Sequence, residues 1–426
     1  MKNLHHFSPG ARQQRGAAAL VVTSLLFFVM VLVTLFVNRN LVFEQRASAN
    51  QYRATQAFEA AEAGAEWALA QLNDPQRIGP DCLPVADSAA TSFRSRYISQ
   101  TSAAFAARTW NDGAVATPLQ PTCVRAGTGW NCSCPTNGAP VLNASAGDGP
   151  LPAFSLQFVA GDKPGTLRVL ATGCTSLAGE CLAGSTSNAD ATARVDVTVG
   201  LLAGLRTPPA AALTTRGSVD ADGAAFGAHN ADPATGLALH AGAGIAAGQA
   251  RLTVPAGAPA ASALLSGDAG LAALSADRFF ASYFGLDKQR WKAQPAVKRL
   301  VCSSDCGAAI TAAAAATDGS ALIWIDGDLA LDGPVTVGSV EHPVVLVVDG
   351  TARIRGAVTF HGLLYGTALS WNDTAVPGAV VRGAAVSESN YAGNGTPEFV
   401  YDSSVLTTLT TRSGSFARIN GGWRDF

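Results

Sequence analysis

A short basic leader runs directly into a long apolar segment at the start of the chain. Lys2, Arg12 and Arg15 precede this segment, and residues 17–37 then contain no charged side chain. As an α-helix with a rise of about 1.5 Å per residue, these 21 residues span about 30 Å, the thickness of the hydrocarbon core of a bilayer. The sequence therefore predicts a helix that crosses a membrane.

The flanks of the apolar segment indicate how the chain lies in the membrane. A cleavable secretory signal has a shorter apolar region, roughly 7–15 residues, with small residues at a cleavage point on its far side, and neither feature is present. Because the positive charges precede the segment, the positive-inside rule places the first residues in the cytoplasm and the bulk of the chain outside. A plain signal anchor is one interpretation of this pattern.

Two stretches of the N-terminal region carry a family resemblance. Residues 12–20 read Arg-Gln-Gln-Arg-Gly-Ala-Ala-Ala-Leu, and residues 56–64 read Gln-Ala-Phe-Glu-Ala-Ala-Glu-Ala-Gly. With the apolar helix between them, they resemble the N-terminus of PilX-type minor pilins of type IV pili. The resemblance implies that a prepilin peptidase cuts between Gly16 and Ala17, that Ala17 becomes N-methylated, and that the helix serves as membrane anchor and assembly stalk. Glycine suits such a site because a side chain would obstruct close approach to the backbone.

One position departs from the common pilin pattern. Most pilins carry Glu at the fifth residue after the cut, where it is thought to pair with the amino terminus of a neighbouring subunit, and this chain has Val21 there. A buried carboxylate without its partner is strongly destabilising, so an apolar residue suits a subunit that never makes this pairing. PilX-like proteins and the K-type pseudopilin of type II secretion both tend to lack the Glu. By resemblance, Val21 implies a place at or near the fibre tip, or in an initiating complex.

The helix is expected to continue beyond the membrane to residue 73. Apolar residues recur there at steps of three and four, opposite a charged face that includes Glu59, Glu62 and Glu66. No proline interrupts the pattern before the stop signal at residues 73–75, so a helix over residues 17–73 would be about 85 Å long. The apolar face consists of Ala54, Phe58, Ala61, Ala65, Leu69 and Leu72.

Residues 74–204 are expected to form a strand-rich head. Period-two alternation predicts strands over residues 154–159, 167–171 and 194–199, which suit an antiparallel sheet laid over the stalk helix. The chain has eight cysteines, and an even count in an exported chain favours disulfides over a metal site. No histidine lies near the cysteines and their spacings match no common zinc finger. We expect local pairs Cys174–Cys181 and Cys302–Cys306, with Cys82 and Cys123 joined to Cys132 and Cys134 in either combination.

Residues 205–426 carry a weak internal repeat. Residues 215–223, 325–333 and 348–356 share glycine at the third and ninth places and apolar residues at the fifth and seventh. Two copies start 23 residues apart, a suitable length for one coil of a β-solenoid. Alternation directs the apolar residues of the second copy inward and its acids outward. The inward set is Ile323, Ile325, Leu329 and Leu331, and the outward set is Asp326, Asp328 and Asp332.

A helical insertion is expected at about residues 268–300. It supplies Leu274, Phe279, Phe280 and Phe284 in a chain that is otherwise poor in aromatic residues. We favour a cap that seals the end of the solenoid over a partner-binding surface, because exposed aromatic patches are uncommon and solenoid ends need covers. Residues 421–426 are expected to form a terminal strand or cap in which Trp423 is packed.

The sequence offers little for chemistry. It contains no Gly-x-Ser-x-Gly elbow, no phosphate-binding loop and no His-Glu-x-x-His. The outward aspartates lack the Gly-Gly-x-Gly-x-Asp pattern of calcium-binding solenoids, and the convergence of carboxylates that a glycan-cleaving enzyme needs is not visible in a sequence. With 14% charged residues and a net charge of −2, there is no basic stripe for nucleic acid. We expect no enzyme activity, cofactor, metal or nucleic acid.

These observations predict an α+β protein in four parts: a leader (1–16), a transmembrane and stalk helix (17–73), a cysteine-containing head (74–204) and a solenoid-like domain (205–426). The expected function is that of a type IV pilus minor pilin in assembly initiation or at the tip, with a candidate adhesive head. Implied partners are minor and major pilins, prepilin peptidase, the inner-membrane assembly platform and a large tip adhesin. The implied location is the bacterial inner membrane, then the pilus. The alternatives are a K-type tip pseudopilin and a signal-anchored surface protein acting on glycans.

Overall fold

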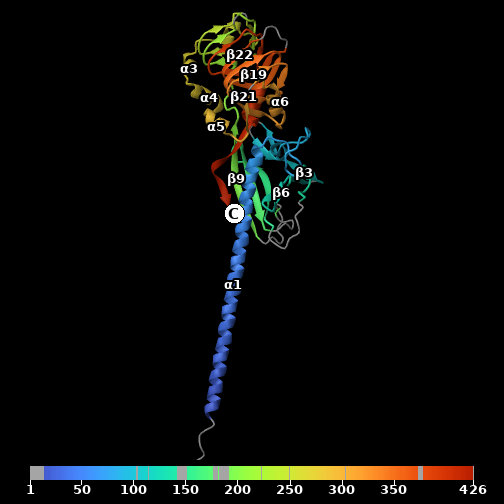
Figure 1. Cartoon of the computed structure of the whole chain (residues 1–426), viewed down its shortest axis with the longest axis vertical. Helices are drawn as coiled ribbons and strands as arrows, with labels where there is room; N and C mark the ends of the chain where they lie inside the picture. The colour runs from blue at the N-terminus through green and yellow to red at the C-terminus, as the bar shows by residue number, and fades with distance from the viewer. Residues whose placement is uncertain are drawn as a thin grey trace, which may run out of the picture.

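The computed structural model describes residues 14–101, 104–113, 115–141, 151–175, 181, 191–221, 223–248, 250–302, 304–372 and 378–425. Residues 1–13 of the expected leader lie outside the described residues. Helix α1 (Gln14–Asn73) extends from the rest of the chain for more than half of its length (Figure 1). Its 60 residues correspond to about 90 Å at 1.5 Å per residue. The helix ends where Asp74 and Pro75 follow, because proline cannot continue it.

The head is an antiparallel sheet laid along the last turns of α1, with strand order β26-β9-β8-β7-β5-β6. The three strands expected from alternation are present as β7 (Ala153–Ala160), β8 (Thr166–Cys174) and β9 (Thr192–Ala203), which confirms the strand-rich head. The other elements before β9 are α2 (Phe93–Tyr97), β1 (Ile98–Thr101), β2 (Ala104–Ala107), β3 (Thr109–Asp112), β4 (Val115–Pro118), β5 (Thr122–Ala126) and β6 (Gly129–Ser133).

Aromatic side chains fill the core between α1, α2 and this sheet. Phe93 is fully buried, and its ring centroid lies 5.3 Å from that of Trp67 on α1 and 5.9 Å from that of Phe158 on β7. Fully burying a side chain of this size contributes roughly 1.5–3 kcal/mol. The helix is therefore part of the head core and not only a support beneath it.

The last strand of the chain belongs to the head. β26 (Gly414–Asp425) pairs antiparallel with β9, and its buried Phe416 joins the head core. Figure 1 accordingly shows the C-terminus beside α1. This corrects the boundary expected for residues 205–426, because the final strand returns to the first sheet. Trp423 is 42% exposed and only partly packed, edge-on to Phe58, because β26 is an edge strand.

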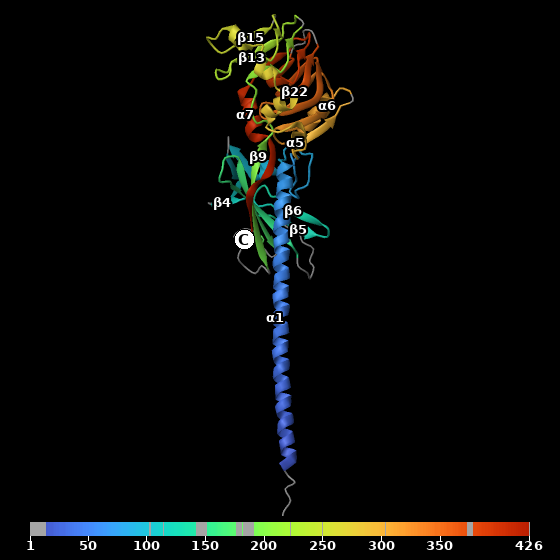
Figure 2. The same ribbon diagram turned by 90° about the vertical axis from the view of Figure 1, so that its left-hand side faces the viewer.

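The C-terminal region forms a second sheet, and all of its described strand pairs are parallel. Its strands β13 and β15 lie at the end of the molecule farthest from the free end of α1 (Figure 2). The 16 strands are β10 (Ala211–Thr215), β11 (Val219–Asp220), β12 (Gly227–His229), β13 (Leu237–Ala241), β14 (Ile245–Ala246), β15 (Arg251–Thr253), β16 (Leu264–Leu265), β17 (Val297–Val301), β18 (Ala321–Asp326), β19 (Leu329–Asp332), β20 (Val335–Val337), β21 (Val344–Arg355), β22 (Val358–Trp371), β23 (Val380–Ser387), β24 (Tyr391–Ala392) and β25 (Glu398–Tyr401).

The weak sequence repeat matches the register of this sheet. Ile325 pairs with Val348, Val348 with Gly366, Gly366 with Ser387, and Ser387 with Thr215. The first residues of all three repeat copies therefore lie in one row across the strands. The apolar residues expected to point inward are buried in a common core, namely Ile323, Ile325, Leu329 and Leu331.

The helical insertion lies on the side of the parallel sheet, which corrects its interpretation as an end cap. In β18, Leu322 and Trp324 alternate with the inward residues and form a second core with Phe279 and Phe280. The strands are apolar on both faces, so the outer face also needs a cover. The end of the inner core instead receives Ile310 from α6. The helices of this region are η1 (Ala260–Ala263), α3 (Ala269–Ala272), α4 (Ala276–Phe284), α5 (Lys288–Lys292), α6 (Gly307–Ala315) and α7 (Ser403–Arg412).

Candidate functional site: the anchor and stalk helix

The first half of α1 exposes a continuous apolar surface. Its large apolar side chains from Leu20 to Phe43 are exposed, Phe27 by 71% and Met30 by 69%. By length and composition this segment can cross a membrane, and its most apolar window has no buried residue. Apolar surface of this extent is stable only against lipid or other protein chains.

The fold itself does not determine the residues at the expected processing site. Gly16 and Ala17 are exposed in the first turns of α1, and a Cβ added to Gly16 would meet no atom within 4 Å. Val21 is 61% exposed, so its residue type is also not set by packing within the chain. Any requirement at these positions must come from an external partner.

The motif at residues 56–64 forms the contact between α1 and the head sheet. Ala57 and Ala61 are fully buried, and the Gly64 position lies against the ring of Phe154. Strand β8 approaches so closely that a Cβ on Gly173 would lie 2.0 Å from the carbonyl oxygen of Ala57. The small residues of the motif therefore let the backbones of helix and sheet touch.

The opposite side of this part of α1 is acidic. Glu59, Glu62 and Glu66 are exposed, and Glu66 forms an ion pair with Arg418 of β26. Ala54, expected on the apolar face, is exposed because the contact with the sheet begins at Ala57. Pairs of exposed charges stabilise a fold by about 1 kcal/mol at most, so this acidic face is chiefly a solvated surface.

Helix α1 has a counterpart among known protein families. Residues 15–66 match the family model described as PilX N-terminal. The N-terminal segment of the chain is therefore similar to the PilX N-terminal domain. The match covers the apolar half of α1 and the motif at residues 56–64, which contacts the head sheet. It leaves out the head sheet and the parallel sheet.

A solved structure is weakly similar over most of the chain. Among solved structures, the chain is similar to the competence-associated pilin ComZ from Thermus thermophilus, with 12% identity, 88% of this chain and 97% of that chain covered, and a TM-score of 0.22. A TM-score this low supports no conclusion about shared architecture. No curated protein matches the chain.

Outside the PilX N-terminal domain, the cysteines lie in four pairs. Cys123 and Cys132 are direct partners on β5 and β6, with Cα atoms 4.0 Å apart. Of the two combinations left open by the sequence, the structure holds the one in which Cys82 pairs with Cys134. A cross-link of this kind stabilises mainly by restricting the unfolded chain. The two remaining pairs are Cys174–Cys181 and Cys302–Cys306.

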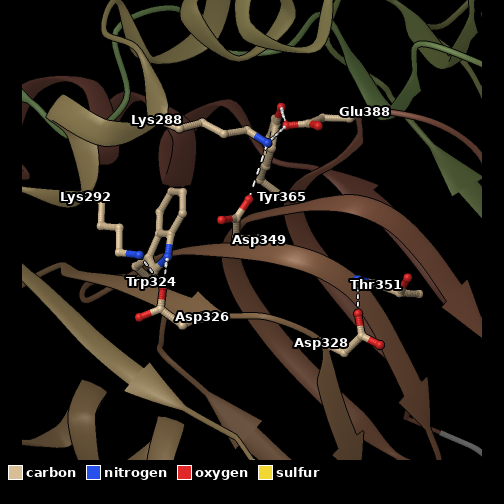
Figure 3. A network of polar contacts seen from close by, with 9 residues as sticks. All are labelled: Lys288, Lys292, Trp324, Asp326, Asp328, Asp349, Thr351, Tyr365 and Glu388. Atoms are coloured by element: carbon tan, nitrogen blue, oxygen red, sulfur yellow. Dashed lines mark hydrogen bonds and ion pairs between the residues drawn. The ribbon is translucent and has the colours of Figure 1, made fainter.

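Asp326, one of the outward aspartates, is held by two cations and an indole, and Figure 3 shows Lys292 and Trp324 beside it. Its carboxylate accepts hydrogen bonds from Lys292 of α5, from Arg299 at 3.0 Å and from the Trp324 Nε1–H at 3.0 Å. Chiefly because of Lys292, the pKa of Asp326 falls to about 2. This contact joins α5 to β18.

Of the other two outward aspartates, Asp328 is engaged through its carboxylate and Asp332 through its backbone N–H. Asp328 accepts a hydrogen bond from the Thr351 N–H and pairs with Arg353, each at 2.8 Å. The Asp332 N–H donates to Asp305 at 3.0 Å. Among the described residues, no group of three or more His, Cys, Asp or Glu side chains is arranged to hold a metal ion.

A charge cluster around the buried Glu388 joins the insertion to the outer face of the sheet. Lys288 lies 2.5 Å from the carboxylate of Glu388, whose side chain is only 4% exposed, and 3.5 Å from Asp349 (Figure 3). The Tyr365 hydroxyl donates to the same Glu388 at 2.7 Å. Burial, followed by the Glu388 charge, raises the pKa of Tyr365. The charged groups pair with one another and with the Tyr365 hydroxyl, and such a network helps to fix the position of the insertion on the sheet.

Acid is expected to loosen α5 from β18. The pKa of Asp326 is depressed from 3.8 to about 2, so its contacts stabilise the fold above about pH 4, and this contribution is lost as the pH falls through about 2. Replacing Lys292 with alanine should raise the pKa of Asp326, measured by NMR titration of its carboxyl carbon. Lys298→Ala on β17 is the matched control, because Lys298 is exposed. An unchanged pKa in Lys292→Ala would contradict this assignment.

Sequence reasoning missed two residues, Asn73 and Arg94, that bind the first residues of β26. Asn73 accepts a hydrogen bond from the Phe416 N–H at 2.7 Å and donates to the Phe416 carbonyl at 3.0 Å. Arg94 donates to the Gly414 carbonyl at 3.1 Å and lies 4.7 Å from the centre of the Phe416 ring. Asn73 was interpreted only as a helix stop signal, and no local pattern reveals a partner 343 residues away.

Proposed function

We propose that the chain is a minor pilin that prepilin peptidase cuts between Gly16 and Ala17 and N-methylates at Ala17. The observation that carries this proposal is the exposed apolar half of α1, directly after Gly16, within a PilX N-terminal domain. An apolar helix needs lipid before assembly and other helices after it. The proposed partners are therefore minor and major pilins through α1, together with the peptidase and the inner-membrane assembly platform.

We propose further that the subunit acts in assembly initiation or at the pilus tip. A fibre that grows from the membrane has its helix N-termini toward the membrane and its heads directed away from it. Here the C-terminal region lies beyond the end of α1, along the long axis of the molecule (Figures 1 and 2). In a helical fibre the next subunit would need this space, whereas a subunit at the end is unobstructed. Val21 in place of the usual Glu also supports an end position.

For residues 205–412 we propose a short β-solenoid that is presented at the tip for adhesion, alone or with a large tip adhesin. The parallel pairing, the aligned repeat and the apolar inner core support it. The strand-rich head disfavours the K-type pseudopilin, whose head is largely helical in that family. For a glycan-cleaving enzyme, the aspartates of the repeat offer little support, because Asp326 and Asp328 are engaged by cations.

The test is the N-terminal mass of the full chain expressed with and without prepilin peptidase. We expect peptidase-dependent loss of residues 1–16 and methylation of Ala17. Replacing Gly16 with leucine should abolish this processing and leave the fold unchanged, because a side chain there meets no atom within 4 Å. Val21→Leu is the matched control for a bulky change in the same exposed segment and should be processed normally. An intact leader in both strains would refute the pilin proposal and favour a signal anchor.

A further inference from the structure

The C-terminal region begins and ends at one point of the head sheet. β9 and β26 are antiparallel neighbours, and their last paired residues are Ala203 and Gly414. Just beyond them, the Gly204 N–H donates to the Ser413 carbonyl at 3.0 Å. Two strands that meet in this way form a hairpin, and a turn of two residues is commonly enough to connect them. In this chain, residues 205–412 occupy the position of that turn.

Two backbones lie close together where β9 ends and β26 begins. Gly414 has a φ of +132°, and a Cβ there would lie 2.1 Å from the Leu202 carbonyl oxygen. A Cβ on Gly204 would lie 2.4 Å from Cδ2 of Leu322. Glycine at both positions lets the two strands leave the sheet side by side.

The apolar cores divide along the same boundary. The head core draws on residues 61–199 and then on Phe416, with no buried member from residues 205–412 among the described residues. The two cores of the C-terminal region begin at Leu205 and end at Leu409. A segment with a complete core of its own and adjacent ends has the properties of an independently folding domain.

The contacts across the boundary are mainly polar. Ser92 donates its N–H to Asp318 at 2.8 Å, and the Asp318 N–H donates to the Pro75 carbonyl at 3.1 Å. The indole N–H of Trp291 donates to the Gly204 carbonyl at 2.9 Å. A cavity of about 250 Å³ lies between the two parts and is lined by residues of both, including Ser92 and Asp318. Such an interface orients two domains without merging their cores.

We propose that residues 205–412 are a self-contained module inserted into the last hairpin of a complete pilin, and that residues 17–204 with 413–426 are the whole assembly unit. The module then carries the contact with the outside partner and contributes nothing to subunit packing. This inference rests on the proposed pilin function for its assembly role. The separability of the two parts does not depend on that function.

The test replaces residues 205–412 with an Asn-Gly turn between Gly204 and Ser413. In cells that lack the gene, we expect this variant to be cut by prepilin peptidase and to restore about as many pili as the full chain. The matched control ends at Gly204, so that it loses both the module and β26, and it should be degraded because its head core lacks Phe416. A second chain, residues 205–412 alone and exported to an oxidising compartment, should unfold in one cooperative transition.

Each outcome decides the inference. A variant that folds and is processed but restores no pili would show that the module takes part in assembly. If the variant is degraded or the isolated module has no cooperative transition, the two parts are not separable, and the inference fails. If the full chain itself is not processed or restores no pili, the pilin function fails instead, and the folding of the two separated parts still decides whether the module is an insertion.

Discussion

Replacing Phe416 with alanine is expected to lower the free energy of unfolding of the head by about 3–5 kcal/mol. Phe416 is 2% exposed, and its ring centroid lies 5.1 Å from that of Phe105. The change would leave a cavity in the head core and remove the stacking of Arg94. Hydrogen exchange of the detergent-solubilised full chain, followed at the amides of β8 and α2, measures the effect.

The control for this prediction is Phe399→Ala. Phe399 is 1% exposed in the inner core of the C-terminal region, so the same truncation should speed exchange in β22 and β23 and leave β8 protected. Conversely, Phe416→Ala should leave β22 protected, although residue 416 follows that region in the sequence. If both variants loosen the same amides, the division of the molecule into two cores is wrong.

The parts of this fold that the sequence predicts are those with local signals. The uncharged run over residues 17–37 and the small-residue face of the motif at residues 56–64 determine α1 and its contact with the sheet. Alternation over residues 154–159 predicts β7 correctly, because Phe154, Leu156 and Phe158 lie on the face that packs in the head core. The aspartates of the repeat were also assigned outward from alternation alone.

The rest depends on partners that are distant in sequence. β10 pairs with β23, so Thr215 lies beside Ser387, and nothing local reveals that a strand near the start of the region pairs with a strand near its end. The run Ala-Leu-Ile-Trp-Ile in β18 is apolar on both faces, which hides the outer core that helices α4 and α5 cover. The cations that hold Asp326 come from α5 and β17, and only tertiary structure brings them to it.

The same limits apply to the candidate site. Gly16, Ala17 and Val21 were found through a family resemblance, and the fold places no internal demand on them, so only a partner can explain them. By contrast, Gly173 carries no sequence signal, since a single glycine in a strand has many explanations. The structure explains it through the 2.0 Å approach to the backbone of α1.

Replacing Gly173 with valine is therefore expected to separate α1 from the head sheet. The new Cβ would lie 2.0 Å from the Ala57 carbonyl oxygen and 2.4 Å from the Ala61 nitrogen, and neither backbone atom can rotate away. Overpacking commonly costs about 1–3 kcal/mol, and we expect a loss at the upper end because helix and sheet must both move. Hydrogen exchange along residues 57–72 of α1 measures the separation.

Gly129→Val is the matched control for Gly173→Val. Gly129 also lies in a strand of the same sheet, but a Cβ there meets no atom within 4 Å, so this variant should keep normal exchange in α1. If the proposed pilin function holds, α1 joins the membrane to the head, and its release in Gly173→Val should also reduce the recovery of pili in cells. Normal protection of residues 57–72 in that variant would mean that the small-residue face of the motif does not set the distance between helix and sheet.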